Sequence, residues 1–303
     1  MIEIENLSKR YGAKLAVDGI SAIVRPGLVT GFLGPNGAGK STTMRMIMGL
    51  DRPTTGSVRV NGKPYSHHRA PLREVGALLE AKAVHTGRSA RNHLLALAAT
   101  HGIPSRRVDE VIEMTGLTSV ARKRAGKFSL GMGQRLGIAA ALLGDPQTLI
   151  LDEPVNGLDP EGVLWVRQLT RYLASQGRTV FLSSHLMSEM AQTADHVIVL
   201  GRGRILADAS IAEVLAGATH KLVKVRTPDE QRLVDAVAGP DVTVTRGADG
   251  SLEIVGIGSD RIGEAAARDG VVLHELTPVG ASLEEAYLEL TQDDVEYRSE
   301  AAR

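Results

Sequence analysis

The fold is decided by residues 34–41, which read Gly34-Pro35-Asn36-Gly37-Ala38-Gly39-Lys40-Ser41. This stretch fits the pattern G-x-x-x-x-G-K-[ST], and it lies between Leu28–Leu33, predicted as a strand, and Thr42–Leu50, predicted as a helix. Glycines let backbone N–H groups close around phosphate oxygens, and the start of a helix adds the positive end of its dipole. The stretch therefore predicts that residues 34–42 bind the phosphates of a nucleotide, with a glycine-rich turn carrying a chance lysine as the weaker alternative.

An acidic strand end supplies the second half of the predicted site. Thr148–Leu151 is apolar enough to be a buried strand, and Asp152 and Glu153 follow it directly. In phosphate-loop enzymes the lysine reaches the β- and γ-phosphates, the serine hydroxyl meets Mg²⁺, and the acid holds the ion through water. A carboxylate one residue later can polarise the attacking water. The sequence thus predicts an ATPase that uses ATP and Mg²⁺, with Lys40 and Glu153 catalytic and with Ser41 and Asp152 at the metal.

Further motifs follow in an order and spacing that resemble the nucleotide-binding domains of ABC transporters, over residues 2 to about 215. They are Tyr11, the loop at Glu80, the signature-like run Phe128–Arg135, the loop Asn156–Asp159, and Ser183-Ser184-His185 at a strand end. The signature-like run discriminates best, because many phosphate-loop enzymes share the first two features while few begin a helix with Ser-x-Gly shortly before the acidic strand. Each motif alone is weak, and their order together identifies the family.

The resemblance implies a role for each of these residues within one subunit. Tyr11 is implied to stack on adenine. His185 is implied to contact the γ-phosphate as a third catalytic residue. Glu80 falls where the family places a glutamine that contacts the metal or its water and senses the membrane subunit.

The resemblance also implies a second ATP-binding subunit, so that two copies pair head to tail as a homodimer. Ser129 and the Gly131 backbone of one copy would bind the γ-phosphate of ATP held by the other, and Asp159 would couple the two sites. Closure driven by ATP and opening after hydrolysis would then move the membrane subunits.

The expected fold is an α/β phosphate-loop core of ABC type over residues 1–218, with an antiparallel β subdomain and a helical subdomain at about 86–144. Within it, Ser57–Val60 and the Asn61-Gly62 turn predict a hairpin. Residues 219–291 are expected to form a small accessory α+β domain, and residues 292–303 a disordered tail. The accessory domain has predicted elements in the order β-α-β-β-α-β of a ferredoxin-like arrangement, followed by a last helix at Leu283–Leu290. Its predicted strands are Lys221–Arg226, Val242–Thr245, Leu252–Val255 and Val271–Leu276, and its first helices are Asp229–Ala238 and Asp260–Arg268.

Two departures from the common family pattern narrow the class. Met132 and Glu80 stand where glutamines are usual, and signatures of this kind resemble the branch associated with bacitracin and lantibiotic self-protection. Residues 282–291 resemble the end of daunorubicin-type exporter ATPases. Both resemblances imply export of a drug, antibiotic or peptide-like substrate through a membrane-spanning permease subunit encoded separately.

Three other functions are weighed against export. A soluble ABC ATPase acting on DNA or ribosomes would carry a long coiled-coil insertion or two nucleotide domains, and neither is evident. An importer ATPase more usually keeps glutamine at the position of Glu80. An idle regulatory subunit is not supported, since Lys40, Asp152, Glu153 and His185 are all present.

Composition agrees with a globular chain that meets its partners locally. Lys+Arg and Asp+Glu both number 35, so the formal net charge of zero gives no general attraction to nucleic acid, and no nucleic-acid partner is expected. The absence of cysteine rules out disulfides and thiol catalysis. The apolar stretches are far shorter than the roughly 18–20 residues of a membrane helix. The chain is therefore not expected to span a membrane by itself, and the resemblance to ABC transporter subunits implies a cytoplasmic protein that lies peripherally on the inner face of the cell membrane.

Overall fold

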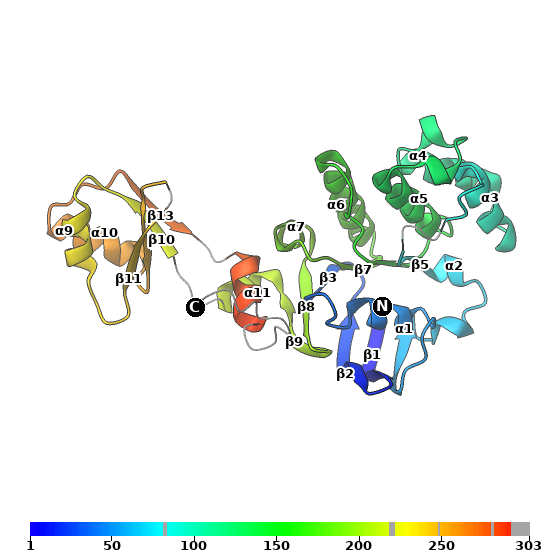
Figure 1. Cartoon of the computed structure of the whole chain (residues 1–303), viewed down its shortest axis with the longest axis horizontal. Helices are drawn as coiled ribbons and strands as arrows, with labels where there is room; N and C mark the ends of the chain where they lie inside the picture. The colour runs from blue at the N-terminus through cyan, green and yellow to red at the C-terminus, as the bar shows by residue number, and fades with distance from the viewer. Residues whose placement is uncertain (81–83, 218–221, 248, 280–281, 292–303) are drawn as a thin grey trace. The chain divides into compact units, whose positions relative to one another are not determined.

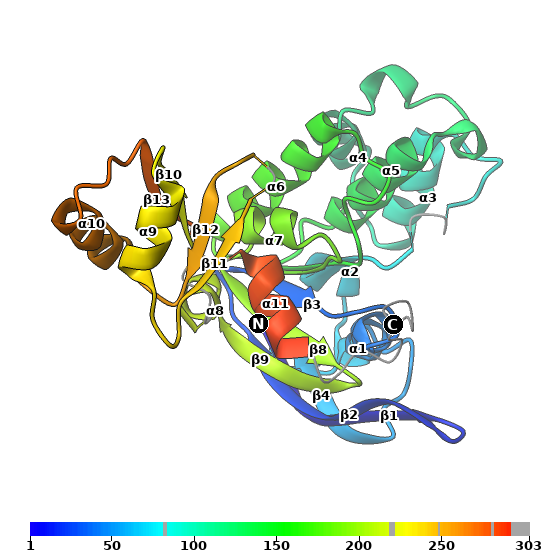
Figure 2. The same ribbon diagram turned by 60° about the vertical axis from the view of Figure 1, so that its left-hand side comes forward.

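The computed structural model describes residues 1–80, 84–217, 222–247, 249–279 and 282–291 (Figures 1 and 2). By compactness the chain divides into a first unit built mainly from Met1–Ile211 and a second unit of Ala212–Glu289. The predicted domain boundary near residue 218 lies close to this division. The tail predicted at residues 292–303 lies outside the described residues.

A six-stranded sheet forms the centre of the first unit and confirms the predicted, largely parallel α/β core. The strand order is β5-β6-β7-β3-β8-β9, and every neighbouring pair is parallel except β8 with β9. The strands are β3 (Val29–Leu33), β5 (Val75–Leu78), β6 (Thr148–Leu151), β7 (Thr179–Ser183), β8 (His196–Gly201) and β9 (Arg204–Ser210). All residues of β3, β6 and β7 are buried, as expected for strands covered on both faces.

The parallel order determines where polar loops meet. Strands β6, β7 and β3 are consecutive neighbours, so the loops that leave their carboxyl ends emerge at one edge of the sheet. These loops lead into α1 (Lys40–Ile47) after β3, α6 (Pro160–Ser175) after β6 and α7 (Met187–Thr193) after β7. The buried rings of Phe32 and Phe181 pack with centroids 5.0 Å apart between β3 and β7. This edge is where the predicted site residues gather.

A three-stranded antiparallel sheet accounts for the N-terminal segment, with β1 (Ile2–Tyr11) between β2 (Lys14–Val24) and β4 (Thr55–Val60). The predicted antiparallel subdomain is therefore present. The hairpin predicted around Asn61-Gly62 is wrong, because β4 pairs with β1, aligning Ile2 with Val60. The turn does form, with a single bridge between Val60 and Lys63, but the chain then enters a 3₁₀ turn (Tyr65–His67) and α2 (Pro71–Glu74). Pairing with the central strand buries Val60 fully, which a local hairpin could not do.

The helical part contains α3 (Ala90–Thr100), α4 (Ser105–Met114) and α5 (Leu130–Leu142), which lie together in both views (Figures 1 and 2). Two 3₁₀ turns, Thr118–Val120 and Ala125–Lys127, join α4 to α5. Helix α5 lies very close to β5: a Cβ added to Gly76 would stand 1.9 Å from the Ala141 carbonyl oxygen. Close backbone approach at glycine thus fixes α5 on the sheet.

We expect Gly76→Ala to destabilise the first unit by about 1–3 kcal/mol, because the added methyl group would overlap main chain that cannot move aside. Urea unfolding followed by circular dichroism measures the change. Gly263→Ala, in the helix Ser259–Arg268 of the second unit, is the matched control, since its Cβ would meet only the Leu276 side chain at 3.4 Å. An unchanged unfolding midpoint for Gly76→Ala would contradict the close approach.

The second unit has the predicted β-α-β-β-α-β order and a four-stranded antiparallel sheet ordered β11-β12-β10-β13, which is the ferredoxin-like topology. Its strands are β10 (Leu222–Arg226), β11 (Thr243–Arg246), β12 (Leu252–Val255) and β13 (Glu275–Val279). Its helices are α8 (Ile211–Gly217), α9 (Glu230–Val237), α10 (Ser259–Arg268) and α11 (Leu283–Thr291). Apolar side chains of β10, β12, α9 and α10 form its core.

The last strand of the second unit lies later than predicted. The apolar run after α10 suggested a strand at Val271–Leu276, whereas β13 is Glu275–Val279 and contains Pro278. Val271 is instead a buried residue of the connection. An edge strand tolerates proline because one side of its backbone has no ladder partner, and β13 is at the edge of the sheet.

Candidate functional site

The loop between β3 and α1 folds around its own lysine. The Lys40 ammonium donates to the carbonyl oxygens of Gly34 at 2.6 Å and Pro35 at 3.2 Å. Its side chain is 7% exposed, and burial lowers its pKa, while the charges of Glu153 and Asp152 oppose that shift. A buried ammonium with two carboxylates nearby is therefore held at the centre of the loop.

Glycines give this loop its shape. Gly39 has a left-handed backbone with φ of 107°, and a Cβ there would lie 2.5 Å from the Ala16 carbonyl oxygen. Gly39 also holds the N-cap position of α1, and since it has no side chain it cannot accept from the first N–H groups of the helix. The backbone N–H groups at the start of α1, near Ser41 and Thr42, are therefore suited to bind an anion. The structure thus brings the predicted residues 34–42 into one cradle.

The end of β6 is tied to the ends of its two neighbouring strands. Asp152 donates its backbone N–H to the Leu78 carbonyl oxygen of β5 at 2.7 Å. The Ser183 hydroxyl, at the end of β7, donates to Asp152 Oδ1 at 2.5 Å and accepts the Glu153 backbone N–H at 2.9 Å. Ser183 is fully buried. This one hydroxyl therefore orients the Asp152 carboxylate and the Glu153 main chain together.

Glu153 and His185 face one another across the same edge. His185 Nδ1 lies 2.8 Å from Glu153 Oε2, and the side chains are 50% and 22% exposed. Glu153 also has a left-handed backbone with φ of 49°, which is uncommon for a residue other than glycine. The carboxylate and the imidazole are thus paired and still open to solvent, so a water molecule or a phosphate can reach them.

A buried amide fixes the main chain of Glu153 from the helical part. Gln134 of α5 donates from Nε2 to the Glu153 carbonyl oxygen at 2.9 Å, and its side chain is 3% exposed. The sequence-based prediction assigned no role to Gln134 or to Ser183. Both lay inside quoted motifs, Ser183 two residues before His185 and Gln134 within the signature-like run, and that nearness was the signal available.

Tyr11 and Glu80 lie near the loop rather than inside it. Tyr11 is 48% exposed, its hydroxyl donates to Asp51 Oδ2 at 2.9 Å, and Lys9 Nζ stands 4.9 Å from its ring centroid. Glu80 is exposed, two residues after the end of β5. The pKa of Arg45 on α1 is raised, first by its hydrogen bonds to Asp51 and least by the charge of Glu80. Both predicted residues therefore have free surface for a ligand or a partner.

The remaining predicted residues cap helices. The Ser129 hydroxyl accepts the Met132 N–H at 3.2 Å at the start of α5, and Asp159 Oδ1 accepts the Gly162 N–H at 2.9 Å at the start of α6. A Cβ on Gly131 would stand 3.0 Å from the Gly157 carbonyl oxygen, so the signature-like run lies against the loop Asn156–Asp159. These two segments contact each other within the subunit.

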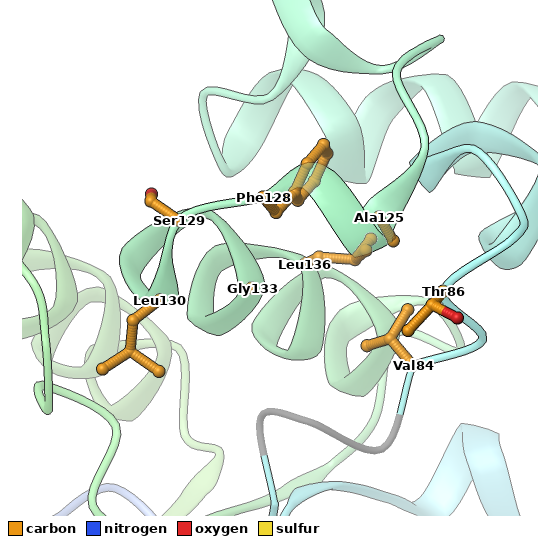
Figure 3. Close-up of a pocket in the computed structure, with 8 residues that line it drawn as sticks. All are labelled: Val84, Thr86, Ala125, Phe128, Ser129, Leu130, Gly133 and Leu136. Atoms are coloured by element: carbon orange, nitrogen blue, oxygen red, sulfur yellow. The ribbon is translucent and has the colours of Figure 1, made fainter.

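The structure does not bring Ser129 to the loop that holds Lys40. Helices α5 and α1 are well separated in both views of the first unit (Figures 1 and 2). Ser129 instead borders a mainly apolar pocket of about 340 Å³, lined also by Val84, Phe128 and Leu136 (Figure 3). Its hydroxyl caps α5 by accepting the Met132 N–H and makes no contact with the loop that holds Lys40 among the hydrogen bonds of the described residues.

A family model described as ABC transporter matches residues 17–156, and one described as a domain of unknown function matches residues 221–284. The bacitracin transport ATP-binding protein BcrA of Bacillus licheniformis is 40% identical over 77% of this chain and 77% of its own length. The Nod factor export ATP-binding protein I of Rhizobium sp. (strain N33) is 32% identical over 97% of this chain and 98% of its own. A solved ATP-binding subunit of an ABC transporter, 26% identical, superposes with a TM-score of 0.65 over 71% of this chain and 92% of that one.

Proposed function

Because this chain belongs to the ABC transporter family as an ATP-binding subunit that hydrolyses ATP, we propose that it powers export of a drug, antibiotic or peptide-like substrate. The substrate would pass through a membrane-spanning permease subunit on a separate chain. None of the helices among the described residues is long and apolar enough to cross a membrane. In this proposal the chain lies on the cytoplasmic face of the cell membrane, bound to the permease.

One observation carries the ATPase part of the proposal. Three consecutive strands deliver a buried ammonium, a braced carboxylate and a carboxylate–imidazole pair to a single edge of the sheet. Lys40 and the N–H groups of residues 34–42 would bind the β- and γ-phosphates. Glu153 would accept a proton from the attacking water, and His185 would contact the γ-phosphate.

The oxygen donors at this edge fit a magnesium ion. Mg²⁺ binds through one or two protein oxygens together with substrate phosphates and water. Ser41 stands at the first turn of α1 with an exposed hydroxyl, and Asp152 holds a carboxylate at the end of β6 oriented by Ser183. These two residues would hold the ion, which when bound neutralises charge on the β- and γ-phosphate oxygens.

In this mechanism Lys40, Glu153 and Tyr11 have separate roles. Lys40 leaves its two carbonyl partners to reach phosphate oxygens, so the negative charge that develops on the γ-phosphoryl group is met by a buried cation. Glu153 Oε2 exchanges its contact with His185 for a water molecule, takes a proton from it, and the water oxygen attacks phosphorus in line with the leaving ADP oxygen. Tyr11, with its exposed ring, would stack on adenine.

The separation of Ser129 from its own cradle supports a working dimer. Ser129 and the Gly131 backbone would bind the γ-phosphate of ATP held by a second copy, and Asp159, in the loop that lies against Gly131, would link the two sites. Head-to-tail pairing gives each nucleotide two subunits to bind, so ATP favours closure and hydrolysis favours opening. Glu80, exposed beside the site, would meet the permease.

Co-purification tests the proposal. The tagged Glu153→Gln variant, expected to hold ATP without hydrolysing it, is expressed in the native host, extracted in mild detergent with ATP, and its partners are identified by mass spectrometry. We expect a polytopic membrane protein in near-equal amount. Recovery with ribosomal or DNA-associated proteins, and no membrane protein, would leave the ATPase standing and overturn the exporter assignment.

A further inference from the structure

The backbone of Glu153 is held at both of its polar atoms by side chains from other elements. Its N–H donates to the Ser183 hydroxyl of β7 at 2.9 Å, and its carbonyl oxygen accepts from Gln134 of α5 at 2.9 Å. Glu153 has φ of 49°, a backbone conformation that a residue other than glycine keeps only when neighbouring groups stabilise it. Both side chains are buried, Ser183 completely and Gln134 to 3% exposure, so solvent does not compete for either bond.

The two braces differ in what they connect. Ser183 belongs to the sheet that also carries the strand before Asp152, so it moves with the site. Gln134 belongs to α5. Ser129 caps the start of this helix and Gly131 lies in its first turn, so both are within five residues of Gln134. The helix is stiff and packed closely: a Cβ on Gly137 would stand 2.5 Å from Leu78 Cδ1 of β5. Gln134 therefore reaches Glu153 from a helix that is held closely against the sheet.

We propose that Gln134 is a positioning residue for Glu153, and that its amide, presented from α5, fixes the main chain of the catalytic base. This inference rests on the proposed role of Glu153. When α5 is placed as in this structure, Gln134 completes the left-handed conformation that directs the Glu153 carboxylate toward His185. Without this amide the carbonyl oxygen would lose its donor and the carboxylate would lose its fixed direction.

The chemistry predicts a loss in turnover rather than in ATP binding. Gln134 touches no group of the phosphate cradle, because its described hydrogen bond is to the Glu153 main chain. A base displaced by a fraction of an ångström still leaves Lys40 and the loop N–H groups intact. The KM for ATP should therefore stay within about twofold while kcat falls about 10- to 100-fold.

The experiment measures steady-state ATP hydrolysis of the full-length chain with Mg²⁺, over a range of ATP and protein concentrations. Gln134→Leu keeps the size of the side chain and removes the donor. Gln134→Met keeps the length of the side chain, has no donor and carries no charge. Thr115→Val is the matched control: Thr115 is fully buried, its hydroxyl donates to the Val111 carbonyl oxygen at 2.8 Å in α4, and the site is not involved.

We expect both Gln134 variants to lose kcat with KM unchanged, with melting temperatures no lower than that of Thr115→Val. Wild-type kcat in both variants, while Glu153→Gln is inactive, would overturn the positioning role and leave the proposed function intact. Full activity of Glu153→Gln would overturn the role of Glu153 as the base, and with it the positioning role of Gln134. If Gln134→Leu does not fold, Gln134→Met decides alone, since a purely structural role would lower its melting temperature without this split between kcat and KM.

Discussion

Glu153→Gln is expected to lower ATP turnover by about 100- to 10,000-fold, the range over which a well-placed general base contributes. The amide keeps the size of the side chain and can still contact His185, but it cannot accept a proton from water. The backbone braces from Ser183 and Gln134 do not depend on the carboxylate, so the fold should be unchanged. Phosphate release from the purified chain with Mg²⁺ and ATP, at saturating nucleotide, gives the measurement.

The same variant should bind ATP normally and accumulate as a closed dimer, visible as an earlier peak in size-exclusion chromatography with ATP and not with ADP. Glu161→Gln is the control, because Glu161 is an exposed acid in the first turn of α6 and lies outside the site. Equal losses in both variants would point to a general effect of charge. Turnover close to wild type in Glu153→Gln would mean that another group activates the water.

The nucleotide cradle and the acidic strand end could be predicted because their information is local. Strand, glycine loop and helix follow one another within residues 28–50, and the backbone N–H groups of the loop need no distant partner to form the cradle. The ferredoxin-like order of the second unit was predictable for a related reason, since alternation of short apolar strands and amphipathic helices marks each element in turn. Those features depend on residues a few positions apart.

Pairings between distant segments could not be predicted in the same way. The turn at Asn61-Gly62 is real, yet β4 finds its partner at Ile2, which is far away in sequence and buries Val60. The strand β13 contains Pro278, and only its place at the edge of the sheet makes that acceptable. In both cases local propensity was correct about what could form and tertiary packing selected what did form.

The braces of the site were missed for a physical reason. Ser183 and Gln134 form hydrogen bonds with main-chain atoms of Glu153. Every residue has these atoms, so no sequence pattern indicates that this pairing will form. Glutamine and serine within a motif also have many other uses, such as helix capping and solvent contact. Only the folded structure brings both side chains to one left-handed residue. The charged groups of the site could therefore be predicted, and the side chains that hold the Glu153 backbone could not.

Lys40→Met is expected to weaken ATP binding by about 10- to 100-fold, as expected for the loss of one charge-assisted hydrogen bond to phosphate. Without nucleotide, Lys40 is buried and burial lowers its pKa, so the ammonium is held there against a desolvation cost. Methionine has a similar length and carries no charge to desolvate. It cannot donate to the carbonyl oxygens of Gly34 and Pro35, so these hydrogen bonds are lost. These two effects oppose each other, so the melting temperature of the free protein should change little.

Addition of Mg·ATP separates the two consequences, because a ligand that binds only the folded state raises the melting temperature according to its affinity. The wild-type chain should show a rise that grows with ATP concentration, and Lys40→Met should need about 10- to 100-fold more ATP for the same rise. Lys63→Met, at an exposed position in the turn after β4, is the matched control and should behave as wild type. A Lys40→Met chain with wild-type ATP affinity would show that the backbone N–H groups of the loop bind the phosphates without the ammonium, and that Lys40 serves the free state alone.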